Sequence, residues 1–163
     1  MPSDTAQKDE ISEQRIAAWR ALLSAHAAQV ARLTVAFAEA DLPPLSWYDV
    51  LRALDDAPQH AMRPRDLGCG VTISRSGMTR LLDRIEDAGL VERRACDTDR
   101  RGLLVILTEA GERTLREMSP IYEGELGAGF AGAMSDEEAK TLAGLLERIG
   151  GEAESDPAGE PAR

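Results

Sequence analysis

The stretch ISRSGMTRLLDRIEDAGLVERRACDTDRRGLLVILTEAG, residues 73–111, changes its hydrophobic period midway. In its first half the apolar residues recur at helical spacing, which predicts a helix over about residues 75–88. The side of this helix expected to face a core carries Met78, Leu81, Leu82 and Ile85. The runs 90–95 and 102–107 have the composition of strands and flank a polar segment, so they predict a β-hairpin.

Helical periodicity also precedes this stretch. Residues 11 to about 40 form one long amphipathic pattern, which we expect to end at Asp41-Leu42-Pro43-Pro44 because proline cannot continue the helical hydrogen bonds. A second helix is predicted to begin at a capping-box-like pair, Ser46 and Asp49. Its expected buried face is Trp47, Val50, Leu51 and Leu54. After this helix we expect a turn over residues 55–61 and then a short third helix over about residues 64–68.

Cap residues delimit the remaining helices. Ser74 is a plausible N-cap and Gly89 a C-cap signal for the helix at 75–88. Thr108 is expected to cap a helix that runs to about residue 127. Ser135 and Glu138 form a capping box for a last helix to about residue 149.

The order of elements predicts a mainly α fold with a small β-hairpin, namely a winged helix-turn-helix with long terminal helices. The terminal helices are too long for the core of such a module and therefore need another surface to cover them. The expected organisation is a flexible tail over 1–10, a long helix over 11–41, the winged helix-turn-helix over 42–108, further long helices over 109–149 and a flexible acidic tail over 150–163.

Composition narrows the class of protein. With 163 residues, 43% of them hydrophobic and 29% charged, the chain is expected to be globular. It contains no uninterrupted run of about eighteen apolar residues. The beginning, Met1-Pro2-Ser3-Asp4, lacks a basic-then-apolar signal pattern, so a cytoplasmic location is predicted. Two cysteines do not make a disulfide framework, which fits a reducing compartment.

The distribution of charge removes the objection that an acidic chain should avoid DNA. The net charge is −10, but residues 63–101 contain nine arginines against seven acids. The first half of the helix at 75–88 carries no acid, and its exposed polar positions are Ser74, Arg75, Ser76, Thr79 and Arg80. Arginine can pair with guanine in the major groove, and Ser or Thr can bond to phosphates or bases. The hairpin adds Arg93, Arg94, Arg100 and Arg101. Arginines at a hairpin tip suit the narrow minor groove.

Residues 73–94, followed by Asp97-Thr98-Asp99-Arg100-Arg101-Gly102 and Leu107-Thr108-Glu109-Ala110-Gly111, resemble the MarR family of bacterial transcriptional regulators. The flanking helices agree in order and length, so the resemblance extends over about residues 14–149. The chain departs from the family pattern at Gly68-Cys69-Gly70, where a good helix former is usual.

The resemblance implies a homodimer that binds double-stranded DNA at a roughly palindromic operator, most simply as a repressor. It makes residues 11–41 and 109–149 the dimerisation helices and residues 42–108 the DNA-binding domain. It places Ser74, Arg75, Ser76, Thr79 and Arg80 at the major groove. It also places Asp99, Arg100 and Arg101 on the wing, with Arg101 in the minor groove and Asp99 holding the wing to its own module. Many members of the family bind small, often aromatic anions between the dimer helices and the DNA module. The candidates for such a pocket here are Trp19, Arg20, His26, Trp47, Tyr48 and Arg52.

Plainer interpretations stay open beside these. A tryptophan at helical spacing is often a core residue, and His26 on an apolar face is often a buried histidine. Cys69 and Cys96 could make a thiol-based redox sensor or be two ordinary thiols. A winged-helix protein-interaction module without DNA binding is the alternative function. Neither zinc-type ligand spacing nor an enzyme motif is present, so no metal, cofactor or catalytic residue is expected. The acids Asp83, Glu86 and Asp87 are explained as ion pairs with arginines on the helix surface.

Overall fold

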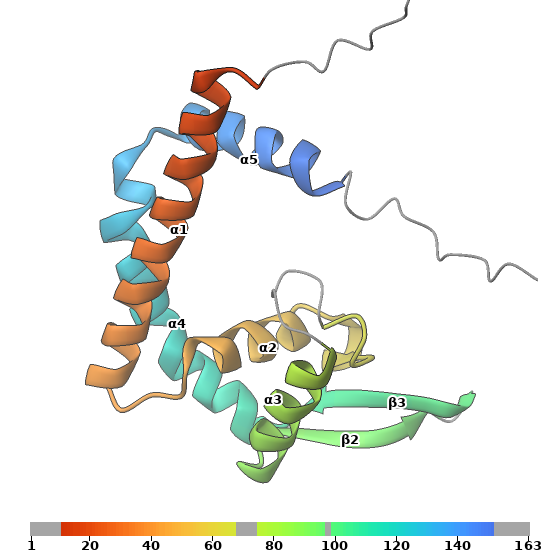
Figure 1. Ribbon diagram of the computed structural model, residues 1–163. Helices are drawn as coiled ribbons and strands as arrows, with labels where there is room; N and C mark the ends of the chain where they lie inside the picture. Colours follow the sequence, from red (N-terminus) through yellow and green to blue (C-terminus); the bar gives the residue numbers. More distant parts are fainter. Residues whose placement is uncertain (1–10, 68–74, 97–98, 152–163) are drawn as a thin grey trace, which may run out of the picture. The chain divides into compact units, whose positions relative to one another are not determined.

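The computed structural model describes residues 11–67, 75–96 and 99–151 (Figure 1). The elements in chain order are α1 (Glu13–Glu39), α2 (Leu45–Asp55), a 3-10 turn (Pro58–His60), β1 (Ala61–Met62), α3 (Arg75–Asp87), β2 (Val91–Cys96), β3 (Asp99–Leu107), α4 (Glu109–Gly129), a second 3-10 turn (Ala131–Ala133) and α5 (Asp136–Gly151). The chain divides into two compact units between Tyr122 and Glu123. The predicted class, mainly helical with a small antiparallel sheet, is confirmed.

The sheet contains the predicted hairpin and one strand that the sequence did not reveal. Its order is β1-β3-β2, and both pairings are antiparallel. Val91 lies opposite Leu107 in the hairpin, and the register is irregular only between Ala95 and Cys96. β1 has just two residues, with Met62 opposite Val105. A strand this short has no period to detect, because its pairing depends on the fold around it. The hairpin extends beyond the helices of its unit (Figure 1).

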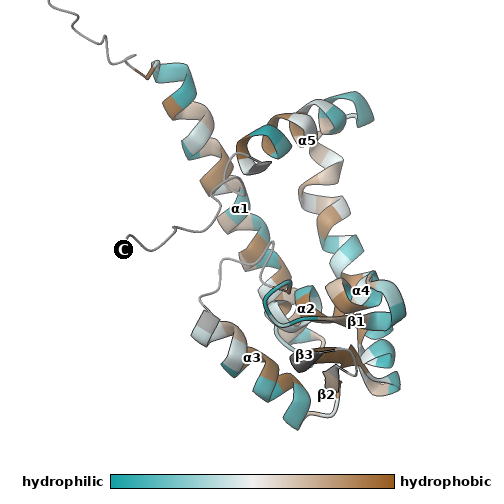
Figure 2. Cartoon of the chain, turned by 90° about the vertical axis from the view of Figure 1, so that its right-hand side faces the viewer, coloured by the Kyte–Doolittle hydropathy of each residue, from teal (hydrophilic) through white to brown (hydrophobic). Residues whose placement is uncertain are grey.

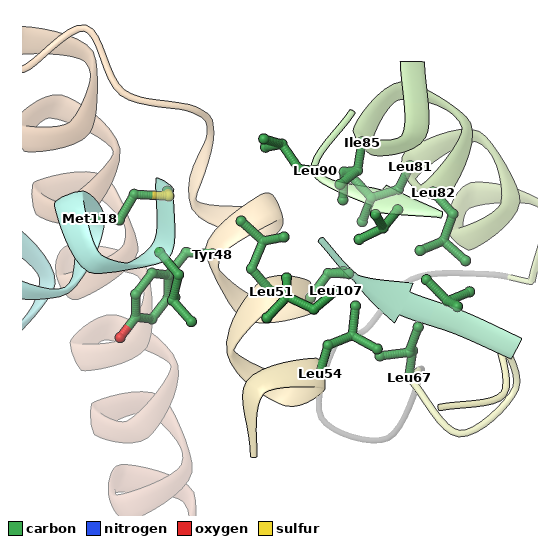
Figure 3. Packing of buried hydrophobic residues seen from close by; sticks show 14 of the residues in the cluster. Tyr48, Leu51, Leu54, Leu67, Leu81, Leu82, Ile85, Leu90, Leu107 and Met118 are labelled. Carbon is green, nitrogen blue, oxygen red and sulfur yellow. The ribbon is translucent and has the colours of Figure 1, made fainter. Parts of the chain in front are cut away.

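The core of the first unit lies where α2, α3 and β3 meet, joined by the beginning of α4. Leu51 and Leu54 of α2 are fully buried, as are Ile85 of α3 and Val105 of β3. Figure 3 shows apolar side chains that converge from α2, α3 and β3, among them Leu51, Ile85 and Leu107. The four predicted core positions of α3 are all buried, namely Met78, Leu81, Leu82 and Ile85. Hydrophobic colour is strong along β3, as expected for the middle strand of a sheet (Figure 2).

Two helices of this unit end in the same hydrogen-bonded motif. After α3, Gly89 has a φ of 73°, and the N–H groups of Gly89 and Leu90 donate to the carbonyls of Glu86 and Ile85. This is a Schellman ending, so the C-cap prediction at Gly89 is confirmed. After α1, Asp41 adopts a φ of 54°. The N–H groups of Asp41 and Leu42 donate to the carbonyls of Ala38 and Phe37, which is the same pair of bonds. The end of α1 is therefore set at Asp41, before Pro43 and Pro44 are reached.

The caps predicted for the last two helices are confirmed. The Gly111 N–H donates to Thr108 Oγ1 at 3.1 Å, and the Thr108 hydroxyl donates to the Gly89 carbonyl at 2.8 Å. Thr108 therefore joins the end of α3 to the beginning of α4. Before α5, the Ser135 N–H donates to Glu138 Oε2 at 2.8 Å and the Glu138 N–H donates to Ser135 Oγ at 3.4 Å. These reciprocal bonds are a capping box.

Two local predictions in the first unit are wrong. α2 begins at Leu45 with Pro44 at its N-cap and no side-chain cap, so Ser46 and Asp49 already lie inside the helix. The fixed φ of proline at −57° supports this start without a capping side chain. Residues 64–67 form a turn and not a helix. The N–H groups of Asp66 and Leu67 both donate to the Arg63 carbonyl and close this turn. Residues 68–74 lie outside the described part.

Most of α1 exposes apolar residues. Only Leu33 and Phe37 are buried, whereas Trp19 is 57% and Leu23 is 48% exposed. By length and composition α1 is also long and apolar enough to cross a membrane. One such helix near the N-terminus is only weak evidence for a membrane span. Figure 2 shows the hydrophobic residues of α1 recurring between polar ones along its length. This amphipathic pattern suits a helix that is covered along one face by protein.

Candidate nucleic-acid interface and ligand cavity

α3 presents one polar face to solvent. Its apolar face packs on the sheet, which leaves Ser76, Thr79 and Arg80 exposed. Arg80 makes no ion pair with any residue in the described part of the chain. Of the other two predicted major-groove residues, Arg75 is the first residue of α3 and Ser74 lies outside the described residues. The N-terminal half of α3 therefore carries donor groups without a carboxylate among them.

The acids of α3 are held by the neighbouring strand. Arg93 of β2 contacts Asp83 Oδ1 through Nη2 and Glu86 Oε2 through Nη1, both at 2.7 Å. The Arg93 backbone N–H also donates to Glu86 Oε1 at 2.9 Å. The Arg93 side chain is only 22% exposed, so these bonds are better shielded from water than surface ion pairs are. We call this group, Asp83, Glu86 and Arg93, the α3–β2 clamp.

The clamp corrects the expected partners of these acids. Asp83 and Glu86 pair with an arginine from the hairpin, not with arginines on their own helix. Arg93 is consequently not available as a DNA contact, and Arg94 pairs with Glu92 beside it in β2. The single positive charge of Arg93 offsets one of the two negative charges of Asp83 and Glu86, which lowers the repulsion that a DNA backbone would meet there.

α3 is joined to α2 by an aromatic contact. The Arg84 guanidinium lies 5.9 Å from the centroid of the Trp47 ring, within the range of a cation–π interaction. The Trp47 Nε1 atom is buried and has no hydrogen-bond partner within the described ranges. Trp47 therefore serves the junction of the two helices.

The wing prediction concerns residues of which only the backbone is described. Asp99, Arg100 and Arg101 begin β3, and Asp99 lies opposite Cys96 at the end of the hairpin. Cys69, like residues 97–98, lies outside the described residues. The hairpin thus places the three predicted wing residues at its tip.

A cavity of about 590 Å³ lies between α1, α2 and the part of α4 that belongs to the first unit. Its apolar lining includes Leu33, Leu45 and Leu67, and its polar lining includes His26, Asp49 and Arg52. A volume of this size is typical of pockets for small organic ligands.

Two tyrosines form an aromatic wall of this cavity. Tyr48 of α2 and Tyr122 of α4 stack with their ring centroids 4.3 Å apart and an interplanar angle of 17°. Phe37 of α1 lies behind them, 6.0 Å from the Tyr48 ring. Desolvation, reinforced by the nearby Asp49 carboxylate, raises the pKa of Tyr122 above its ordinary value. Burial also raises the pKa of Asp49.

The arginine that lines the cavity, Arg52, is already paired with two carboxylates of its own helix and the turn after it. Arg52 Nε donates to Asp56 Oδ2 at 3.0 Å and Nη2 donates to Asp56 Oδ1 at 2.7 Å. Its third nitrogen, Nη1, lies 4.0 Å from Asp55 Oδ2. The hydrogen bond and charge of Asp56 raise the pKa of Arg52, so the guanidinium stays ionised. This is a bidentate pair, the geometry in which arginine binds carboxylates most strongly.

Comparisons with known proteins show which family this chain resembles. Residues 40–102 match the model described as MarR family. The chain is 41% identical to the transcriptional repressor MprA of Escherichia coli K12 over 70 residues, which cover 43% of this chain and 40% of MprA. The crystal structure of AbsC, a MarR family transcriptional regulator from Streptomyces coelicolor, is similar with a TM-score of 0.80 and 26% identity, covering 90% of this chain and 99% of AbsC. Residues 40–102 of this chain therefore match the MarR family, and the fold of the chain is that of a MarR-family regulator.

A second Streptomyces coelicolor structure shows the same fold. Sco3205, a MarR family regulator solved in complex with DNA, has a TM-score of 0.79 and 23% identity, covering 88% of this chain and 90% of that one. The match to MprA spans less than half of either protein. The winged helix-turn-helix fold inferred from residues 73–111 is confirmed by the similarity to AbsC.

The structure brings together half of the residues predicted for the ligand pocket. His26, Tyr48 and Arg52 line the cavity. Trp19, Arg20 and Trp47 do not. His26 is exposed, so the interpretation of it as a buried histidine is wrong. Sequence reasoning missed Asp49 and Tyr122. The helical spacing of Asp49 from Arg52 could have indicated the first, but Tyr122 is distant in sequence and gave no signal.

Metal binding receives no support in the described part of the chain. No group of three or more His, Cys, Asp or Glu side chains there could hold an ion. His26 and His60 stand on different elements, and His60 Nδ1 contacts Asp55 Oδ1 at 3.5 Å.

Proposed function

We propose that this chain is a sequence-specific DNA-binding transcriptional regulator, acting as a dimeric repressor. The observation that carries the proposal is the polar face of α3, where Ser76, Thr79 and Arg80 stand exposed beside a wing. In a winged helix-turn-helix, this face enters the major groove and its N-terminal residues reach the base edges. The similarity to MprA, a repressor, and to Sco3205, which was solved with DNA, supports the same assignment.

Dimerisation is the second part of the proposal. Apolar side chains remain exposed on α1 and, in the second unit, on α5, and they are too many for a stable monomer surface. They are Ile16, Trp19, Leu23, Val30, Leu145 and Ile149. Burial of this surface against a second copy would give the two recognition helices a two-fold relation. The operator is then expected to be roughly palindromic, with half-sites about one helical turn apart.

A small-molecule effector is the third part. The cavity lies on α2, the helix that precedes the recognition helix, and it has the size and mixed lining of a ligand site. A ligand that binds one arrangement of the helices more tightly than the other would change DNA affinity. A regulator of this kind acts in the cytoplasm, and MarR-family regulators are in general not enzymes.

Fluorescence anisotropy with the DNA upstream of the chain's own gene tests the proposal. We expect tight binding that survives scrambled competitor and weakens steeply with salt, as phosphate contacts require. Arg101→Ala should abolish this binding, whereas Arg113→Ala, which removes an exposed arginine of α4, should leave it unchanged.

The same pair of variants separates the alternative function. A protein-interaction module would bind DNA no better than scrambled sequence, and Arg101→Ala would then have little effect. Failure to select any specific fragment from the whole genome would reject the DNA-binding proposal.

A further inference from the structure

We propose that the cavity between α1, α2 and α4 selects a hydrophobic organic cation, such as an aromatic ammonium compound, over an aromatic carboxylate. The inference rests on the proposed function, because it names the ligand class for the effector site of that regulator. It reverses the expectation from the family resemblance, in which an arginine of the pocket would pair with an anionic ligand.

The charges of the lining favour a cation. The cavity carries two carboxylates, Asp49 and Asp56, and one arginine, Arg52. All three nitrogens of that guanidinium already face Asp56 or Asp55. An incoming carboxylate would have to break a bidentate pair and would then lie among three acids. The other basic residue of the lining is His26, on the exposed face of α1.

Asp49 is the group that a cation would satisfy. It is half-buried, and within the described residues it has no ion-pair partner. Its burial is uncompensated, which is why its pKa is raised. An ammonium group beside it would supply both the missing counter-charge and hydrogen-bond donors.

The remaining surface suits the apolar part of such a ligand. Tyr48 and Tyr122 both line the cavity, and aromatic rings attract cations and pack against other aromatic groups. Leu33, Leu45 and Leu67 complete an apolar lining. A half-buried carboxylate beside aromatic and aliphatic side chains suits a compound that is both hydrophobic and positively charged.

A pair of probes that differ chiefly in charge tests the inference. Isothermal titration of the full chain would compare 2-naphthylmethylammonium with 2-naphthoate at neutral pH. We expect the ammonium compound to bind at least about tenfold more tightly, since a charge-assisted bond in a partly buried site is worth that factor or more. Asp49→Asn should weaken its binding by about tenfold and leave naphthoate no weaker. Glu117→Gln, which removes an exposed acid outside the lining, should change neither.

A second variant tests the role of the arginine independently. Asp56→Asn removes the bidentate partner of Arg52 and should tighten naphthoate binding several-fold. Circular dichroism of each variant confirms that it is folded.

Two outcomes would overturn the inference: naphthoate binding as tightly as the ammonium probe, or neither probe binding. The anisotropy assay with operator DNA keeps the two proposals apart. Intact DNA binding without ammonium selectivity rejects only the ligand class, whereas selective ammonium binding without DNA binding rejects only the regulator.

Discussion

The α3–β2 clamp makes a quantitative prediction about how the recognition helix is held to the wing. Arg93→Met keeps most of the apolar stem and removes the charge. Its contact with Asp83, which is 51% exposed, should contribute little, about 0.3–0.5 kcal/mol, because water screens it. Glu86 is 33% exposed and accepts a charge-assisted bond from the Arg93 guanidinium, so this contact should contribute about 1–1.5 kcal/mol. The Arg93 backbone N–H is still present in the variant and keeps its own bond to Glu86. The substitution should therefore lower the free energy of unfolding by about 1.3–2 kcal/mol.

Urea denaturation at one fixed protein concentration measures this quantity, because the proposed dimerisation would make the stability depend on that concentration. A double-mutant cycle of Arg93→Met with Glu86→Gln should give a coupling energy of about 1 kcal/mol, and the cycle with Asp83→Asn should give less than half of that. Arg94→Met is the matched control, because Arg94 is 66% exposed and its pair with Glu92 lies on the surface.

The reasoning is refuted if Arg93→Met is no more destabilising than Arg94→Met, or if the larger coupling belongs to Asp83. Either result would mean that solvent exposure does not decide the strength of these contacts. The clamp would then be a surface network without a structural role.

Three further results are expected. Gly111→Ala should destabilise the chain by about 1–3 kcal/mol in urea, because a Cβ there would overlap the Leu90 carbonyl oxygen and lie 2.6 Å from a Leu107 methyl carbon. Gly124→Ala, on the same helix with nothing within 4 Å, should stabilise it by up to about 1 kcal/mol, and equal signs for the two would contradict the packing argument. Asp49→Asn should raise the free energy of unfolding at neutral pH. Because burial raises the pKa of Asp49 in the folded state, the wild-type chain loses stability as pH rises through that pKa. The stability difference between variant and wild type should vanish below about pH 4, where the carboxyl is protonated in both states.

The sequence predicted those elements whose signals are local. The helical spacing of apolar residues in α3 predicted a core-facing side made of Met78, Leu81, Leu82 and Ile85. All four are buried, because one face of this helix covers the sheet. Gly89 and Thr108 were recognisable because their motifs need only neighbouring residues. β1 was not recognisable, because two residues have no period and their pairing with β3 is set by the fold.

Ligand-site residues were predicted less well, for a physical reason. Residue type alone favoured Trp19 and Trp47, but a large aromatic side chain can serve an interface or a helix junction equally well. The Trp47 ring faces Arg84 of α3 and not the cavity. Arg52 was identified correctly as a lining residue, yet its charge is already paired within its own helix. The sequence shows that a charge exists, whereas only the structure shows whether it is still available.

The placement of α2 explains how one small domain can couple a ligand to DNA. One side of this helix carries Tyr48 and Arg52 into the cavity, and another side carries Trp47 to Arg84 of α3. Leu51, fully buried, packs in the same core as the apolar face of α3. A close-packed core transmits a shift of one helix to the next instead of absorbing it. A ligand that prefers one position of α2 therefore also biases the position of α3, and DNA bound to α3 must bias ligand affinity by the same factor.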